Sequence, residues 1–589
     1  MSHRARVSSI SSRTSMSSET TTRRFSLQGL LESVPASPAL PYHEYRYEKP
    51  APERKRSIRP LIIKISLAVL GLGFAAWLGA SVLHTAKQRF DFSYKSPDGE
   101  EYELVADQEL PKEPTPVIVT DRAGKTRWTV SIPTSLDFPL RPNTYSNMCS
   151  QSGEISKHIM RLKNPGAPAM AAHFAYYHVD DTFMDIAEAE YQELLPSDKT
   201  RSWESEAGDK NSIGKEAEKG DNSDPNKTCA TSLTFVLETQ DAGFGNTLMS
   251  LWLAYGMAKK EGRAFFVDDR YWAYGKFATY FQPPRDPSCK PPPDHHRLPC
   301  PHHASHLLVS AATFRWTFGG QFADEFENPR KAGVLRQDKI FAMIRDGYEA
   351  LFHLSDIDAA SVEKRVNKLN TQVREEGGMV IGLHIRHGDK HPYEFQYQKS
   401  YIPIDHYVQA AEKLIDNSLD ASEDVSNLEA LMESSKLVVA TDDPEALKDH
   451  SLADAVRAQN DIVLAGKRLD ANVPKKFVDD SIGWEGGFFS DMFWGLGSTS
   501  SIRTRGVTPR SQEQEARRVP SDLAMQLRAL IGRSYLMDLA VVAQSDRVIC
   551  TVSSVGCRLL AVMMGWEESI LRENWKNVDG DFDWKGVPW

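Results

Sequence analysis

The sequence predicts an α/β protein with two lobes that face each other across a cleft, preceded by a single membrane-spanning helix and a stem. Two stretches, after residue 229 and after residue 376, each repeat a strand–turn–helix pattern that is typical of parallel sheets. A third stretch, residues 65–83, contains no charged side chain, and as a helix it spans about 28 Å, close to the hydrocarbon thickness of a membrane.

These patterns predict an organisation of the 589-residue chain by domain. The expected parts are a cytosolic disordered tail (1–60), a transmembrane anchor (61–86), a stem and linker (87–228), a first α/β lobe (229–375) and a second nucleotide-binding lobe (376–589) with a flexible insertion (496–520).

The charges around the anchor predict its orientation. Arg54, Lys55 and Arg56 precede it, whereas acidic side chains predominate in the segment that follows, so the short tail should lie in the cytosol. The bulk of the chain then faces a lumen or the outside, where disulfides form and where Asn226, in an N-x-T sequon, is a glycosylation site.

The composition is that of a globular protein, with 41% hydrophobic and 25% charged residues. This excludes a wholly disordered chain and a polytopic membrane protein. The net charge of −10 argues against a nucleic-acid partner.

The first lobe is predicted from strands at Ser232–Glu238 and Arg263–Asp268, with a helix that begins near Asn246 between them. The second lobe is predicted from strands at Met379–Ile385, Lys436–Ala440, Asp461–Leu464 and Arg547–Thr551 and from helices at Ser521–Gln544 and Ser553–Met564.

The turn Gly243-Phe244-Gly245-Asn246 is the first candidate for binding chemistry. Its glycines allow a ligand to approach the backbone, and the helix N-terminus offers N–H groups to an anion. Leu248 stands where a dinucleotide fingerprint needs its third glycine, which disfavours a dehydrogenase. A purely structural turn remains the alternative.

The segment from His384 to Lys390 is more informative, because it follows a buried strand, where open α/β sheets bind ligands. Arg386 can hold a pyrophosphate with its planar donors, and Lys390 adds a second charge. Asp389 can orient either cation, and Glu394 can act as a general base. The alternative is a solvated charged loop.

Two further motifs follow later strands. In Thr441-Asp442-Asp443-Pro444, one carboxylate can bind a base or ribose and the other can cap a helix. Ser553 and Ser554 lie at a predicted helix N-terminus, where they can bind phosphate or act as plain caps. The flanking Cys550 and Cys557 could close a small loop.

A histidine-rich patch between the two lobes' motifs has no spacing that fits a tetrahedral metal site, and its prolines predict a loop, so no metal is expected. Its members are Cys289, His295, His296, Cys300, His302, His303 and His306.

Taken together, the ordered motifs resemble the α1,6-fucosyltransferase family. The similarity covers about residues 229 to 565 and includes Gly243 to Gly245, His384 to Lys390 with Glu394, Thr441 to Pro444, Ser481 to Gly487 and Asp538 to Arg558.

The resemblance implies a GT-B-like fold with two Rossmann-like lobes, GDP-fucose as the donor, inversion at the sugar and no metal or cofactor. It implies that Arg386 neutralises the leaving phosphate, that Glu394 takes the proton of the acceptor hydroxyl, and that Asp389 and Lys390 support that loop. Donor contacts are expected from Gly243, Phe244, Gly245, Asn246, His384, His387, Asp442, Asp443, Asp538, Ser553 and Ser554.

The resemblance also implies the bridges Cys550–Cys557 and Cys229–Cys289, whereas the pairing of Cys149 and Cys300 stays open. His387 stands where the family has a second arginine. No domain like the SH3-like one of the core-fucosylating enzyme follows, so the N-glycan-core acceptor is not carried over.

The expectation is therefore a Golgi-membrane, single-pass type II transferase that moves fucose to a glycan hydroxyl, with a homodimer left open. One alternative keeps the fold but uses another nucleotide sugar. The other is a non-catalytic, membrane-anchored protein that binds glycans or acts as a scaffold.

Overall fold

The computed structural model describes residues 111–163, 179–196, 227–238, 243–319, 322, 326–327, 337–387, 401–416, 425–443, 446–462 and 521–587. All of them belong to one compact unit, Glu100–Trp589. The predicted tail, anchor and insertion and the sequon residue Asn226 lie outside the described residues. Across the described ranges, no helix is both long enough and apolar enough to cross a membrane.

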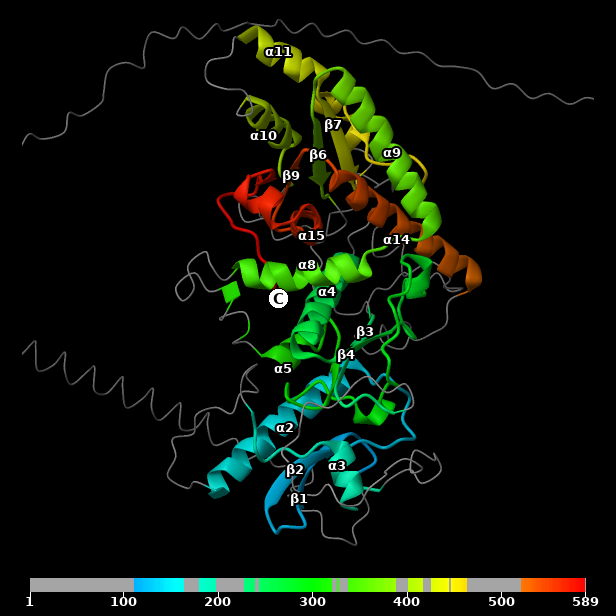
Figure 1. Ribbon diagram of the computed structural model, residues 1–589, viewed down its shortest axis with the longest axis vertical. Coiled ribbons are helices and arrows are strands. Elements are labelled where there is room, and N and C mark those ends of the chain that lie inside the picture. Colours follow the sequence, from blue (N-terminus) through cyan, green and yellow to red (C-terminus); the bar gives the residue numbers. More distant parts are fainter. Residues whose placement is uncertain are drawn as a thin grey trace, which may run out of the picture. The chain divides into compact units, whose positions relative to one another are not determined.

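A five-stranded parallel sheet forms the centre of the second predicted lobe (Figure 1). Its spatial order is β10-β9-β6-β7-β8, so the strand order reverses between the neighbours β6 and β9. The strands are β6 (Val380–Ile385), β7 (Lys436–Thr441), β8 (Val456–Arg457), β9 (Arg547–Cys550) and β10 (Trp575–Asn577).

The first predicted lobe contains a smaller parallel sheet in the order β4-β3-β5. Its strands are β3 (Ser232–Val236), β4 (Ala264–Asp268) and β5 (His306–Val309). The two parallel sheets confirm the α/β class that the strand–turn–helix patterns predict. The domain boundaries themselves stay predictions.

The predicted strand Asp461–Leu464 is wrong in its described half. Residues 461–462 are not in a strand, and the edge strand β8 ends earlier, at Arg457, whereas residues 463–464 lie outside the described residues. The reason is local: the side-chain amide of Gln459 accepts from the backbone N–H of Ile462 and donates to its carbonyl, each at 2.9 Å. This side chain satisfies the backbone groups that a neighbouring strand would otherwise bind.

Helices cover both faces of the large sheet (Figure 1). Alternate strand residues point to opposite sides, so Ile381 and Leu383 pack against α10 (Ile404–Asp416) and Val380 lies in the core on the other side. That other core also contains residues of α9 (Asp356–Glu375) and α14 (Asp522–Val542). A further helix, α11 (Val425–Ser434), precedes β7.

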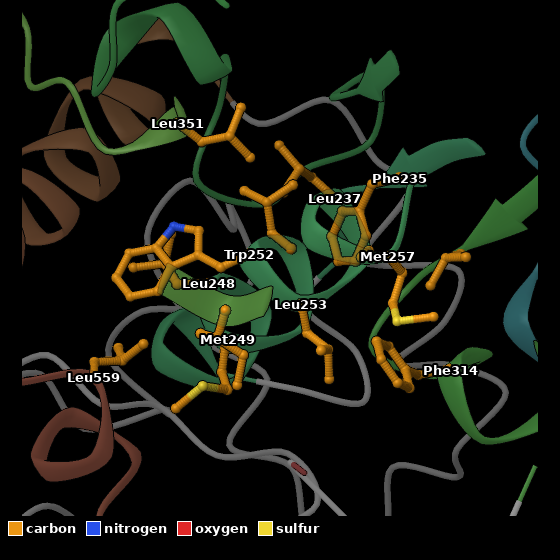
Figure 2. Packing of buried hydrophobic residues seen from close by; sticks show 14 of the residues in the cluster. Phe235, Leu237, Leu248, Met249, Trp252, Leu253, Met257, Phe314, Leu351 and Leu559 are labelled. Carbon is orange, nitrogen blue, oxygen red and sulfur yellow. The ribbon is translucent and has the colours of Figure 1, made fainter. Parts of the chain in front are cut away.

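Two helices of the first lobe, α4 (Phe244–Glu261) and α8 (Gln337–Leu351), touch through their backbones. A methyl group on Gly256 would lie 2.0 Å from the carbonyl oxygen of Met343, and one on Gly347 would lie 2.1 Å from that of Trp252. Only glycine fits at either position. Trp252 is consequently fully enclosed in the core shown in Figure 2.

The helix α15 (Val555–Met564), which follows β9, packs on α4 and α8 and joins the two lobes into one continuous core. Leu559 of α15 lies in the same cluster as Trp252 (Figure 2). Arg345 of α8 donates to the carbonyls of Val562 and Met563, at 2.7 Å each. A cation is favourable at these carbonyls because they end the helix.

Part of the segment predicted as stem and linker is folded. The hairpin strands β1 (Thr115–Thr120) and β2 (Thr126–Ser131) pair antiparallel, and two helices follow, α2 (Pro142–Lys163) and α3 (Ile186–Tyr191). Trp128 is fully buried here, and its indole donates to Asp180 at 2.9 Å.

Three disulfides are present. The expected bridges Cys229–Cys289 and Cys550–Cys557 are confirmed. The third, Cys149–Cys300, links α2 to the histidine-rich segment of the first lobe. The short helix α5 (Phe314–Phe318) follows β5.

Candidate functional site

The strand order places two predicted motifs side by side. In open α/β sheets, ligands bind at the carboxyl ends of the strands, where the strand order reverses. Here that point lies between β6 and β9, and Leu383 pairs with Ile549. The segments that begin at Arg386 and at Thr551 therefore leave neighbouring strands at the same edge of the sheet.

Three hydroxyl groups gather where β9 gives way to α15. Within the described part of the chain, the side-chain oxygens of Thr551, Ser553 and Ser554 are buried and have no hydrogen-bond partner. Thr551 and Ser554 are each only 1% exposed. Ser554 occupies the cap position of α15 without donating or accepting a capping bond from its side chain. These buried groups, at the positive end of the α15 helix dipole, suit an anion.

His384 lies against the first turn of α15, which follows this cluster. Its ring is buried, and a methyl group on Gly556 would lie 2.6 Å from its Nε2 atom and 3.2 Å from the hydroxyl of Tyr535. Strand β6, helix α14 and the first turn of α15 therefore meet at these three residues. Gly556 and Tyr535 were given no role from the sequence, although Gly556 stands inside the Cys550–Cys557 motif.

Arg386 and His387, which directly follow β6, differ in their surroundings. Arg386 is buried, with 6% of its surface exposed. The backbone N–H of His387 donates to Asp442 at 2.6 Å, its Nδ1 atom lies 3.2 Å from the carboxylate of Asp443, and its ring stacks on Tyr401. His387 thus holds the ends of β6 and β7 together.

Asp442 and Asp443, the two aspartates that follow β7, also have a structural role. Both carboxylates bind His387, and the N–H of Asp443 donates to the hydroxyl of Thr441 at 3.1 Å. A carboxylate has further acceptor sites, so these contacts leave room for the predicted donor contact.

The glycine turn before α4 positions an aromatic side chain. Gly243 is the cap residue of α4, and Phe244 is 1% exposed. The ring of Phe244 packs edge-on against Tyr274, at 4.6 Å, and against Tyr535 of α14, at 6.0 Å. This ring is a core contact, which limits any donor contact of Phe244 to its backbone.

Asn246 and Gly245, in the same turn, lie in the first turn of α4. The side-chain oxygen of Asn246 is buried and, among the described residues, has no hydrogen-bond partner. It is the polar atom of this turn that a ligand could still satisfy.

Asp538 lies in the middle of α14 and faces the segment after β8. Burial raises the pKa of its carboxyl to about 8, although hydrogen bonds from Gln459 and the charge of Arg457 act in the opposite direction. Its structural contacts are therefore with the β8 end of the sheet.

The predicted base Glu394 and its neighbours Asp389 and Lys390 lie outside the described residues, so their roles stay predictions. Six of the other expected residues lie in or shortly after the adjacent strands β7, β6 and β9. His384 lies in β6, and the five that follow a strand are Arg386, His387, Asp442, Ser553 and Ser554.

One cavity, of about 630 Å³, lies elsewhere. It adjoins α10 and the edge of the sheet at β9 and β10, and it includes Arg547, the first residue of β9. It is therefore separate from the hydroxyl cluster at the carboxyl ends. Its lining consists of His406, Gln409, Ala410, Lys413, Leu414, Arg547, Arg572, Glu573, Lys576 and Val578.

No family model and no curated protein matches the chain. Among solved structures, it is similar to NodZ α-1,6-fucosyltransferase soaked with GDP-fucose, at 12% identity and a TM-score of 0.27 over 56% of this chain and 92% of that one. NodZ co-crystallized with GDP gives 14% identity and 0.26 over 56% and 91%. Fucosyltransferase NodZ from Bradyrhizobium gives 13% and 0.27 over 56% and 92%. Likeness at this level carries no argument, so the function is inferred from the residues of this chain.

Proposed function

We propose that the chain is an inverting fucosyltransferase-like enzyme, which transfers fucose from GDP-fucose to a glycan hydroxyl without a metal at the reacting centre. The observation that carries the proposal is the cluster of buried hydroxyls of Thr551, Ser553 and Ser554 at the N-terminus of α15. It lies where the strand order reverses, beside the strand that leads to Arg386.

The cluster suits the diphosphate of a nucleotide sugar. Each hydroxyl can donate to a phosphate oxygen, and the first turn of α15 adds N–H groups and the positive end of the helix dipole. The guanidinium of Arg386 supplies the full positive charge. Together these groups stabilise the negative charge that develops on the leaving phosphate, which a metal would otherwise do.

The proposed transfer is a direct displacement. The acceptor oxygen forms a bond to C1 of fucose as the bond from C1 to the phosphate oxygen breaks, and GDP leaves with the electron pair. The hydroxyl proton passes to the carboxylate of Glu394. Attack from the face opposite to GDP inverts the configuration at C1.

The remaining donor contacts are assigned to the nucleoside and its surroundings. We place Asp442, Asp443 and Asp538 toward the guanosine, because they follow or face β7 and β8, which lie on the other side of β6 from the phosphate cluster. The turn from Gly243 to Asn246 would bound the donor from the side of the first lobe, and His384 from the side of the second. The proposal also includes a lumenal catalytic part behind a Golgi-membrane anchor.

The test uses the purified full chain, GDP binding by calorimetry and transfer from GDP-fucose to a panel of glycans. Arg386→Ala should abolish GDP binding. Glu394→Gln should keep binding and lose turnover. Arg572→Ala, in the separate cavity, is the matched control and should leave both unchanged.

Other outcomes would favour the alternatives. If GDP binds but the enzyme turns over another GDP- or UDP-sugar, the proposed fold and site are supported and the proposed donor is wrong. If no nucleotide binds at all, the enzyme proposal fails and a glycan-binding or scaffold protein is the better description.

A further inference from the structure

A second cluster of polar side chains lies away from the hydroxyl site, where α3 meets the histidine-rich segment. Nε2 of His295 lies 3.0 Å from one carboxylate oxygen of Glu190, and Nε2 of His296 lies 3.0 Å from the other. The three side chains are 14%, 10% and 5% exposed for His295, His296 and Glu190. Two imidazoles and a carboxylate thus converge at a site that is nearly closed to solvent.

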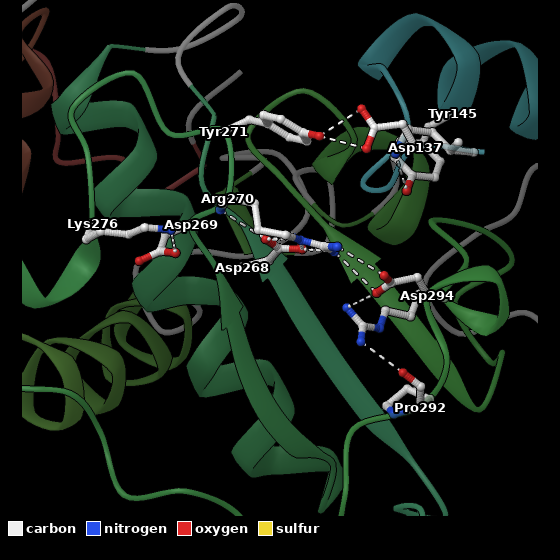
Figure 3. Close-up of polar contacts among 11 residues, drawn as sticks. Asp137, Tyr145, Asp268, Asp269, Arg270, Tyr271, Lys276, Pro292 and Asp294 are labelled. Atoms are coloured by element: carbon white, nitrogen blue, oxygen red, sulfur yellow. Dashed lines mark hydrogen bonds and ion pairs between the residues drawn. The ribbon is translucent and has the colours of Figure 1, made fainter. Parts of the chain in front are cut away.

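The turn that carries the two histidines is held in position by ion pairs, which Figure 3 shows. Arg270 forms ion pairs with both Asp268 and Asp294, and its shorter contact with Asp294 measures 3.0 Å. Arg297 pairs with Asp294 at 2.9 Å and donates to the carbonyl of Pro292. Residues on both sides of His295 and His296 are therefore fixed to the end of β4.

Glu190 is fixed from the other direction. It lies in α3, and Asp185, at the N-cap position of this helix, accepts from the backbone and the hydroxyl of Ser305 at 3.0 and 2.9 Å. The disulfide Cys149–Cys300 ties the histidine-rich segment to α2, the helix that precedes α3. The ligand atoms are thus presented by two separately anchored segments, which is what a preorganised metal site requires.

The chemistry of the three groups matches one class of ion. Zinc takes imidazole nitrogen and carboxylate oxygen at about 2.0–2.1 Å, which separates ligand atoms in a tetrahedron by about 3.3 Å. Each imidazole lies 3.0 Å from a different oxygen of Glu190, and one ligand atom from each of the three residues lies within 4.8 Å of the other two, so a single ion can reach all three.

We propose that Glu190, His295 and His296 bind a zinc ion that clamps α3 to the first lobe. Three protein ligands and a water molecule complete a tetrahedral site of this kind. The ion would cross-link segments more than a hundred residues apart, as the disulfide beside it does. The proposal is independent of the donor site and of the transferase activity.

The test is elemental analysis of the full chain, purified in detergent with a tag that contains no histidine. We expect one zinc per chain. Glu190→Gln and the double variant His295→Ala/His296→Ala should lose it. Their zinc affinity should fall by more than the roughly 10–100-fold seen when a residue that only hydrogen-bonds to a metal ligand is replaced. His450→Ala is the control, because His450 also lies beside carboxylates but its ring is 90% exposed.

A second measurement keeps the test decisive if a variant folds poorly. After zinc is removed from the wild-type chain by a chelator, returning Zn²⁺ should raise the unfolding temperature, and Mg²⁺ should not, because Mg²⁺ prefers oxygen ligands. Co²⁺ in the same site should give visible absorption. A wild-type chain without zinc that shows no thermal response to Zn²⁺ would overturn the proposal and leave a hydrogen-bonded His–Glu–His contact.

Discussion

The imidazole ring of His384 lies directly against the backbone of Gly556. A methyl group on Gly556 would come within 2.6 Å of the Nε2 atom of His384 and 2.7 Å of its Cε1 atom. The two residues belong to β6 and α15, the elements on either side of the strand-order reversal. The glycine therefore sets how closely the first turn of α15 approaches the end of β6.

Gly556→Ala should push the ring of His384 and the first turn of α15 apart, and so shift the turn that carries the hydroxyl cluster. Overpacking of this kind costs about 1–3 kcal/mol in the free energy of unfolding, and we expect GDP affinity to fall as well. The double variant His384→Ala/Gly556→Ala removes the clash and should recover part of the stability in a thermal melt. Equal stability of the two variants would contradict the contact.

Ser554→Ala should separate binding from stability. The buried hydroxyl has no partner in the described structure, so its removal should leave the free energy of unfolding unchanged or slightly higher. GDP affinity should fall about tenfold or more, since a hydrogen bond to a charged group contributes about 1.5–3 kcal/mol. Calorimetric GDP binding and a denaturant melt measure the two effects.

The matched control is Ser156→Ala, because the hydroxyl of Ser156 is also buried but donates to Asp180 at 2.6 Å. It should cost about 1–3 kcal/mol in stability and leave GDP affinity alone. A Ser554→Ala variant that is destabilised and binds GDP normally would mean that the hydroxyl is structural.

Gly347→Ala should strongly destabilise the chain. Its methyl group would meet backbone atoms of Trp252, which cannot rotate away, so the cost should exceed the usual upper value of about 3 kcal/mol for overpacking. Glu349→Ala, two positions along α8, removes only an exposed pair with Arg345 and should change stability by about 0.5 kcal/mol or less. Urea unfolding of both variants makes the comparison.

Asp538 should make stability depend on pH. Burial raises its pKa from 3.8 to about 8, so between these values the folded chain binds a proton that the unfolded chain has released. Its contribution to stability is therefore lost as the pH rises, by at most about 1.4 kcal/mol per pH unit. Asp538→Asn should raise the melting temperature more at pH 8 than at pH 5. The same gain at both pH values would contradict the raised pKa.

Local patterns in the sequence were sufficient for several elements of the fold. The apolar runs at 379–385 and 547–551 became β6 and β9 with ends shifted by one residue, because buried parallel strands are apolar on both faces. The bridges Cys229–Cys289 and Cys550–Cys557, which the family resemblance rather than a local pattern implies, are also present. Strand β8 was misplaced because only two residues pair there, too few to leave a periodic pattern.

Some residues of the candidate site could likewise be predicted from the sequence, whereas the roles of others could not. Ser553, Ser554 and Arg386 stand out in the sequence because polar residues directly follow apolar strands. His387 reads as a weaker cation than arginine, yet its contacts with Asp442, Asp443 and Tyr401 show that it braces two strands. No pattern in the sequence indicates such contacts, because their partners lie more than ten positions away.

The sequence alone determined that β3, β4, β6, β7 and β9 are strands and which polar groups follow them, since burial and backbone preference act over a few neighbouring residues. Only the tertiary structure decided that β6 lies beside β9, that Gly556 touches His384, and that Glu190 meets His295 and His296. Those pairings bring together residues that are distant in the chain. Their free energy comes from packing and from hydrogen bonds in the closed interior, which no local pattern records.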